Sequence, residues 1–244
     1  MKKEFPEVKT MGERAILIEF KPEINEKLLE KILFHKKVIE EHYIKLKVEV
    51  INTYSSLLIY YDSDIENVYS EVLTVEKLIT TPKIPKKVNS RLYHIPVCYD
   101  LDFGLDLEFL AGQKNRPVTE IISLHTQPVY TVYFIGFLPG FLYLGGLDKK
   151  LQISRKEQPR MKVEKGAVGI GENQTGIYPK SSPGGWQIIG KSPVEFFDKN
   201  TEPPCQILAG DKVKFYSISK TEFDKISEEI SIGKFQIRKE NYEG

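Results

Sequence analysis

The chain carries GFLPGFLYLGGLD at residues 136–148 and GENQTGIYPKSSPGGW at residues 171–186. These two stretches concentrate glycine, proline and aromatic side chains, although the 244 residues contain only 17 Gly and 14 Pro in total. Glycine permits positive φ and close approach of the backbone, and proline fixes φ, so such segments hold a defined but non-repetitive shape. The stretches therefore indicate tightly turned, irregular connections rather than helices.

Short apolar or alternating runs lie on both sides of these stretches. They are found at residues 129–134, 168–170, 187–189 and 213–218. Such runs, separated by Gly- and Pro-dense segments, predict a mainly-β barrel. Before them we expect a strand at residues 92–97 and helices at residues 105–111 and after Pro117, whose ring fits the first position of a helix. A short helix is expected after Thr221.

The first part of the chain alternates strand and helix patterns. Residues 15–20 form a short apolar run, and the apolar residues from Ile24 to Ile39 recur at three- and four-residue steps, which predicts a helix. Residues 45–61 predict a hairpin that turns at Ser55-Ser56. Asp64 can cap a second helix that runs to about Lys77. The order β-α-β-β-α predicts a small α+β sandwich of ferredoxin-like type.

The sequence TTPKIPKKVNS interrupts both patterns and predicts a linker near residues 80–91. We therefore expect two domains, an α/β N-terminal domain at residues 1–85 and a mainly-β domain at residues 86–244.

Composition excludes several classes of protein. Hydrophobic residues make up 41% and charged residues 28%, and 35 Lys and Arg balance 34 Asp and Glu, so neither disorder nor a basic nucleic-acid-binding surface is expected. The two cysteines, Cys98 and Cys205, form no CxxC pair, which argues against a disulfide scaffold or a structural zinc site. An export signal and a membrane span are not visible. These features favour a cytoplasmic protein with no membrane or nucleic-acid partner.

Composition alone leaves two interpretations of the glycine-rich stretches open. They form either the tight corners of a β-barrel or a ligand cleft lined by backbone amides. In the second case, the side chains available for hydrogen bonding and stacking are Tyr143, Gln174, Thr175, Tyr178 and Trp186.

The order of these motifs resembles that of a known family. GF-x-PGF-x-YLGGLD, then Pro159-Arg160, then QTGIYP at residues 174–179 and SPGGW at residues 182–186 look like the B subunit of 5-oxoprolinase, KipI and the proteins once described as allophanate hydrolase subunit 1. IPVCYD, FGLDLEFLA and TEIISLHT upstream extend the resemblance over most of residues 92–218. It is weaker in the N-terminal part. The chain departs from the pattern at Leu142, Asn173 and Lys191, where proline, glycine and arginine are expected.

The resemblance implies a fold, an activity and partners. It implies an N-terminal α/β domain followed by a cyclophilin-like β-barrel, and association with the two other 5-oxoprolinase components, a homologous C subunit of the KipA type and an A subunit. Such a complex would use ATP, with magnesium, to open 5-oxo-L-proline to L-glutamate, and this chain alone would be inactive. Two alternatives are a KipI-type inhibitor of a sporulation histidine kinase and a stable barrel whose ancestral site is unused.

The resemblance also implies roles for individual residues. His125, which from its pattern alone is a core or capping histidine, becomes the candidate general acid or base, and Arg160, otherwise a surface arginine, becomes a candidate clamp for a carboxylate or phosphate. Tyr143 and Trp186 either fill the barrel or line the cleft. The implied substrate-binding residues are Tyr143, Arg160, Gln174, Thr175, Tyr178, Ser182 and Trp186. The implied backbone positions of the binding loops are Gly136, Pro139, Gly140, Gly145, Gly146, Gly176, Pro179, Gly184 and Gly185.

GWQIIGKS, residues 185–192, formally fits the P-loop pattern of nucleotide-binding proteins. We reject this interpretation because Trp186, Ile188 and Ile189 predict a strand, and because Pro193 disfavours helical geometry at Ser192. A P-loop lysine and serine should instead open a helix. We also see no cluster of His, Asp or Glu with the spacing of metal ligands.

Overall fold

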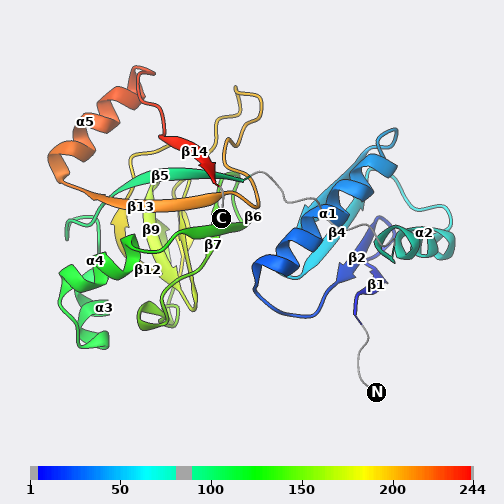
Figure 1. Cartoon of the computed structure of the whole chain (residues 1–244), viewed down its shortest axis with the longest axis horizontal. Coiled ribbons are helices and arrows are strands. Elements are labelled where there is room, and N and C mark those ends of the chain that lie inside the picture. The colour runs from blue at the N-terminus through cyan, green and yellow to red at the C-terminus, as the bar shows by residue number, and fades with distance from the viewer. Residues whose placement is uncertain (1–4, 81–89, 243–244) are drawn as a thin grey trace. The chain divides into compact units, whose positions relative to one another are not determined.

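The computed structural model describes residues 5–80 and 90–242. The chain divides into two compact units, Met1–Val88 and Asn89–Gly244, and each is described by itself (Figure 1). Most of the predicted linker and the predicted boundary between residues 85 and 86 lie outside the described residues. The predicted domain limits therefore stay a prediction.

Unit 1 is an antiparallel sheet covered by two helices. Its strand order is β1-β2-β4-β3. Side chains alternate along each strand, so Ile18 of β2 and Ile59 of β4 reach the same buried core as Ile32 of α1 and Val75 of α2. The elements are β1 (Glu7–Thr10), β2 (Ala15–Glu19), α1 (Glu26–His42), β3 (Val48–Asn52), β4 (Ser56–Tyr61) and α2 (Val68–Thr80).

Unit 1 contains the predicted strand, helix, hairpin and helix in the predicted order, and two details differ. The sheet edge beside β2 is held by β1, which precedes β2 in the chain, so the ferredoxin-like description is not confirmed. Helix α2 begins at Val68 rather than after Asp64, because Asn67 accepts the hydrogen bond from the Ser70 N–H at 2.9 Å. Asp64 instead pairs with Arg14 at 2.6 Å.

Unit 2 is a closed barrel of seven strands. Around the wall the order is β12-β9-β10-β7-β6-β13-β5, and a pairing between Lys191 of β12 and Cys98 of β5 closes the ring. Strands β5 and β13 run parallel and the other neighbouring pairs run antiparallel. The barrel strands are β5 (Ser90–Cys98), β6 (Tyr130–Ile135), β7 (Leu142–Gly145), β9 (Ala167–Gly171), β10 (Gln174–Ile177), β12 (Gln187–Lys191) and β13 (Lys212–Ile218).

The remaining elements of unit 2 cover or extend the barrel. Figure 1 shows α3 and α4 together beside the barrel, while β14 continues the sheet from β5. A separate two-stranded ribbon pairs β8 with β11. Among the described helices, none is both long and apolar enough to cross a bilayer. These elements are α3 (Leu107–Lys114), α4 (Val118–Thr126), the 3-10 helix η1 (Lys149–Leu151), β8 (Arg160–Val163), β11 (Ser182–Gly184), α5 (Lys220–Ser231) and β14 (Lys239–Tyr242).

Glycines in the barrel wall make room for the single tryptophan. A Cβ on Gly171 of β9 would lie 2.5 Å from Nε1 of Trp186, and a Cβ on Gly176 of β10 would lie 3.1 Å from the same indole. The strands therefore present bare backbone on which the indole of Trp186 can pack, and Trp186 is 4% exposed. Here glycine serves close packing in extended strands rather than a turn.

We predict that Gly171→Ala destabilises unit 2 by about 1–3 kcal/mol, because the new methyl group must displace the indole of Trp186. Gly112→Ala is the matched control, since a Cβ on Gly112 of α3 meets nothing within 4 Å. That helical substitution should leave stability unchanged or raise it. Urea unfolding followed by circular dichroism measures both. Equal midpoints for the two variants would contradict the packing argument.

Candidate functional site

Strand β10 divides the predicted site residues between the two sides of the barrel wall. Thr175 is fully buried, and its Oγ1 lies 2.9 Å from Nε2 of His125 inside the barrel. Because side chains alternate along a strand, Gln174 and Gly176 face outward, where Gly176 meets Trp186. The structure therefore brings Gln174 and Trp186 to the outer face and separates them from His125 and Thr175.

An aromatic cluster covers the outer face at this point. The ring of Phe141 lies edge-to-face with Trp186 at 5.5 Å and with Tyr178 at 5.2 Å, and Tyr143 lies 6.1 Å from Trp186. Phe141, Tyr178 and Trp186 are buried, while Tyr143 is half-buried. Three of the predicted binding residues thus form one packed surface, in which only Tyr143 keeps substantial exposure.

His125 lies in the barrel core. Its side chain is fully buried, the Tyr99 hydroxyl lies 2.7 Å from Nδ1, and the ring stacks on Phe215 at 4.7 Å. Burial lowers the pKa of His125 to about 3, so the ring is neutral at physiological pH. Both ring nitrogens are engaged inside the barrel with Tyr99 and Thr175. The acid or base role predicted for His125 stays a prediction, whereas its place in a buried hydrogen-bond chain is observed.

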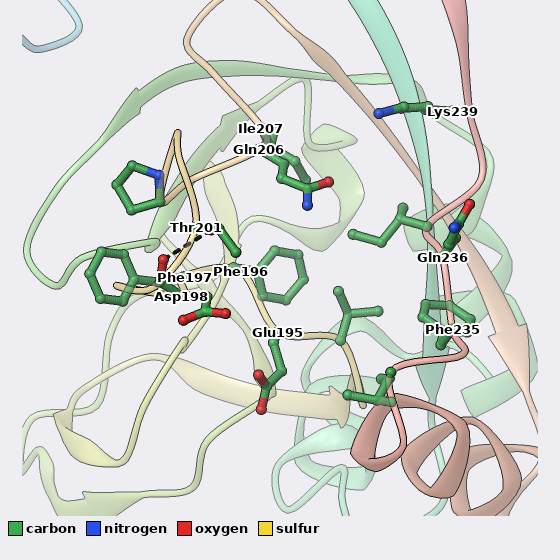
Figure 2. Close-up of a pocket in the computed structure, with 15 residues that line it drawn as sticks. Glu195, Phe196, Phe197, Asp198, Thr201, Gln206, Ile207, Phe235, Gln236 and Lys239 are labelled. Carbon is green, nitrogen blue, oxygen red and sulfur yellow. Dashed lines mark hydrogen bonds between the residues drawn. The ribbon is translucent and has the colours of Figure 1, made fainter.

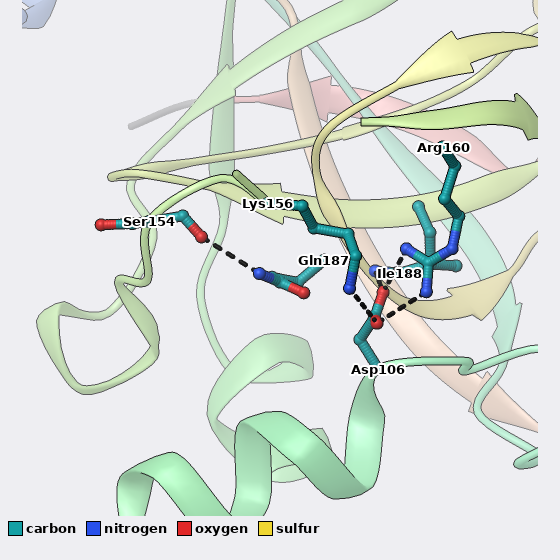
Figure 3. A network of polar contacts seen from close by, with 6 residues as sticks. All are labelled: Asp106, Ser154, Lys156, Arg160, Gln187 and Ile188. Carbon is teal, nitrogen blue, oxygen red and sulfur yellow. Dashed lines mark hydrogen bonds and ion pairs between the residues drawn. The ribbon is translucent and has the colours of Figure 1, made fainter. Parts of the chain in front are cut away.

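Arg160 forms an ion pair with a carboxylate that sequence reasoning missed. Its Nη1 and Nη2 donate to the two oxygens of Asp106 at 2.8 and 2.7 Å, and Lys156 donates to the same carboxylate at 3.1 Å (Figure 3). The backbone N–H of Ile188 adds a fourth hydrogen bond at 2.6 Å. The guanidinium nitrogens of Arg160 that were predicted to bind a ligand thus bind Asp106 of the same chain.

The environment of Asp106 keeps it charged. Burial opposes the charged form, but the hydrogen bonds from Arg160, Ile188 and Lys156 outweigh it and lower the pKa of Asp106. The only sequence clue was an aspartate at the start of a predicted helix. Its side chain does not cap α3, and turns instead toward a segment that lies about 50 residues further along the chain.

The segment from Ser154 to Arg160 is tied to the strand that follows Trp186. The Lys156 N–H donates to the Gly185 carbonyl at 2.7 Å, and Gln187 donates through Nε2 to the Ser154 carbonyl at 3.2 Å (Figure 3). Between these anchors, the guanidinium carbon of Arg155 lies 5.9 Å from the ring centre of Trp186. Arg155, which the sequence analysis did not single out, therefore joins the aromatic cluster.

The remaining predicted residues form tight connections. Gly140 and Gly146 adopt positive φ, 84° and 105°, and a Cβ on Gly140 would lie 2.8 Å from Phe197. Ser182, on β11, donates to the Pro183 carbonyl at 3.2 Å. Gly140 and Gly146 thus lie at tight turns, whereas Gly145 on β7 and Gly176 on β10 lie in the barrel wall, so the stretches predicted as irregular connections also contain strands. The binding role predicted for Ser182 and for the loop backbone stays a prediction for Gly136, Pro139, Gly140, Gly145, Gly146, Gly176, Pro179, Gly184 and Gly185.

The rejected P-loop is a strand, as expected. Residues Gln187–Lys191 form β12, and Ser192 is buried, with its hydroxyl accepting from the Val194 N–H at 3.3 Å. Lys191 lies over the ring of Phe103 at 5.4 Å. No group of three or more His, Cys, Asp or Glu placed to hold a metal ion occurs within residues 5–80 and 90–242.

A pocket of about 600 Å³ lies elsewhere in unit 2, between the loop that follows β12 and the segment that follows α5 (Figure 2). Phe196, Ile207 and Phe235 give it apolar walls, and Asp198 and Lys239 place opposite charges on its lining. Its volume suits a small molecule. Sequence reasoning did not find it, because its two walls are more than 20 residues apart and carry no recognisable motif.

Comparison with known proteins places this chain in a family. The family model described as carboxyltransferase domain, subdomain C and D, matches residues 6–207. The 5-oxoprolinase B subunit of Bacillus subtilis (strain 168) is 37% identical over 236 residues, which span 91% of this chain and 97% of that protein. The chain belongs to the family of 5-oxoprolinase B subunits. The predicted resemblance is confirmed.

Solved structures agree with this assignment at the level of the fold. The crystal structure of TTHA0988 is 29% identical with a TM-score of 0.73, covering 84% of this chain and 40% of that one. Kluyveromyces lactis urea carboxylase is 21% identical with a TM-score of 0.81, covering 96% of this chain and 24% of that one, and this likeness concerns the fold alone. The chain thus spans less than half the length of either protein.

We predict that His125 makes the stability of unit 2 depend on acidity. In the unfolded chain the pKa of His125 is near 6.5, whereas in the folded chain it is about 3. Between these values the unfolded state binds one more proton than the folded state, so the free energy of unfolding falls as the pH drops from 6.5 toward 3. The slope is about 1.4 kcal/mol per pH unit at most. Trp186 fluorescence during urea unfolding reports on unit 2. His125→Gln, which cannot titrate there, should show a flatter dependence, and identical slopes would refute the assignment.

We predict that Asp106→Asn destabilises unit 2 by about 2–4 kcal/mol, since Arg160 and Lys156 lose their shared carboxylate. The loss stays below that of a fully enclosed pair because both cations keep some contact with water. Asp102→Asn is the matched control, because Asp102 is an exposed carboxylate that pairs with Lys220. That control should unfold at the wild-type urea concentration. A similar midpoint for Asp106→Asn would show that the ion network adds nothing to stability.

Proposed function

We propose that this chain is the B subunit of an ATP-dependent 5-oxoprolinase, which opens 5-oxo-L-proline to L-glutamate together with partner subunits. The observation that carries the proposal is 37% identity to the 5-oxoprolinase B subunit of Bacillus subtilis over 97% of that protein. The proposed partners are a homologous C subunit of the KipA type and an A subunit. The proposed location is the cytoplasm. The KipI-type inhibitor of a histidine kinase is not better supported.

The proposed reaction explains the need for ATP. A five-membered lactam is a poor electrophile, and phosphorylation of its amide oxygen turns that oxygen into a leaving group. The sequence that fits a P-loop, residues 185–192, contains strand β12 and not the start of a helix, so we assign it no role in binding ATP. We propose that the reaction needs the partner subunits and that this chain is inactive alone.

We place this protein's part of the site on the outer face of the barrel. Tyr143, Gln174 and Trp186 gather there, and the segment that contains Arg155 brings positive charge to them. Two further cations, Lys156 and Arg160, share one buried carboxylate. The positive charge of Arg155 suits the carboxylate of 5-oxo-L-proline. Thr175, Tyr178, Arg160 and His125 support the surface from below or from within the barrel.

We also propose a cyclophilin-like fold for unit 2 and a fold close to the ferredoxin-like sandwich for unit 1. The closed seven-stranded barrel is consistent with the cyclophilin-like fold that the family implies. The layout of unit 1 is close to a ferredoxin-like sandwich, with β1 at the edge where that fold carries its last strand.

The proposal predicts that glutamate forms from 5-oxo-L-proline only when this chain, ATP and both candidate partners are present together. The measurement is glutamate release, with the chain alone, each pair of proteins and the full mixture compared. Size-exclusion chromatography establishes that the mixture assembles. An assembled mixture without activity would reject the proposed function, and activity of the chain alone would reject its dependence on partners.

A further inference from the structure

We propose that Arg155, Gln174 and Trp186 form a binding site for a small cyclic amide that carries a carboxylate. This inference rests on the proposed function, because it assigns the substrate's carboxylate and lactam N–H to named atoms of the same outer face. Arg155 would bind the carboxylate, and Oε1 of Gln174 would accept the lactam N–H.

The backbone on both sides of Arg155 is anchored. Ser154 before it accepts from Gln187, and Lys156 after it is held at both its backbone N–H and its ammonium group (Figure 3). The guanidinium lies over Trp186 at 5.9 Å. These backbone anchors and the contact with the indole limit the positions that the Arg155 side chain can reach, which reduces the entropic cost of binding an anion there.

The charge of Arg155 is available to a ligand. Arg155 is exposed, and within the described part of the chain no carboxylate pairs with its guanidinium. The carboxylate of Glu172 accepts from the backbone N–H of Arg155 at 3.5 Å. By contrast, Arg160 donates through two of its nitrogens to Asp106. Of these two arginines, Arg155 is therefore the one that can offer a planar fork to a carboxylate.

Gln174 supplies a second, independent observation. Its Oε1 is buried and accepts no hydrogen bond from any described group. Gln174 pairs with Gly171 across β9 and β10, so its side chain shares the face on which Gly171 meets Nε1 of Trp186. A buried acceptor without a donor is costly, and a lactam N–H would satisfy it.

Tyr143 completes the polar rim. Burial raises the pKa of its hydroxyl, and the nearby Arg155 charge partly offsets that rise. The same influence of Arg155 acts on the buried Tyr178 hydroxyl, whose pKa burial also raises. Both phenols therefore stay neutral, and Arg155 lies within electrostatic reach of both. The site thus combines one cation, one amide acceptor and an aromatic rim, which matches a lactam acid.

The single tryptophan of the chain makes the test direct. Trp186 fluorescence is recorded while the purified chain is titrated with 5-oxo-L-proline, and in parallel with 2-pyrrolidinone, which has the lactam but no carboxylate. We expect saturable binding of 5-oxo-L-proline and much weaker binding of 2-pyrrolidinone. Arg155→Ala should weaken 5-oxo-L-proline binding about 10-fold or more, the loss of one charge-assisted contact. Arg155→Lys should lose less affinity for 5-oxo-L-proline than Arg155→Ala, and Gln174→Ala should weaken the binding several-fold.

Arg238→Ala is the control, because Arg238 is an exposed arginine that lies near Glu240 at 3.9 Å and takes no part in the aromatic cluster. It should bind like the wild type. A wild-type chain whose fluorescence ignores 5-oxo-L-proline, or an Arg155→Ala chain that binds equally well, would overturn this site. If the full mixture still makes glutamate in that case, the proposed function stands. If 5-oxo-L-proline binding depends on Arg155 but the assembled mixture makes no glutamate, the proposed function is rejected and the proposed binding site stands.

Discussion

The buried carboxylate of Asp106 is the interaction on which the candidate site depends. It accepts hydrogen bonds from Arg160, Lys156 and the Ile188 N–H, and so joins the start of α3, the segment before β8 and strand β12. Buried ion pairs add little net stability compared with apolar packing, yet removing one partner is expensive. The network therefore acts mainly on geometry. Its hydrogen bonds are directional, so they set the position of the segment that carries Arg155 next to Trp186. Apolar contacts have no such directional preference.

The barrel wall keeps two kinds of chemistry apart. Inside, Tyr99, His125 and Thr175 form a chain of hydrogen bonds that ends on the Gly169 carbonyl, in a space where burial keeps the histidine neutral. Outside, aromatic rings pack on strands whose glycines offer no side chains. Alternation along β10 is enough to separate the two, because Thr175 points inward while Gln174, next to it, points outward. One strand therefore contributes to the core and to the site at once.

Sequence patterns predicted the elements well and their contacts poorly. Alternation and turn residues located five of the seven barrel strands, since both are local properties of a few neighbouring residues. Strands β7 and β10 were missed because they lie inside the Gly- and Pro-rich stretches that predicted irregular connections. Strand β1 was missed because EVKT carries no clear apolar alternation, and Asn67 was missed as a helix cap because Asp64 offered the same chemistry. The pairing of Asp106 with Arg160 joins residues 54 positions apart. No local sequence pattern indicates a pair so far apart, so the sequence analysis predicted that Arg160 binds a ligand.

The distribution of charge bears on how the complex divides its work. Arg155, Lys156 and Arg160 lie on one segment that also carries Glu157, and the buried Asp106 pairs with two of these three cations. Such a surface attracts an anion but supplies no electrophile, and the buried, neutral His125 is in no position to exchange protons with solvent at physiological pH. Under the proposed function, this chain would hold a lactam acid in place, and partner subunits would supply the groups that activate the amide oxygen.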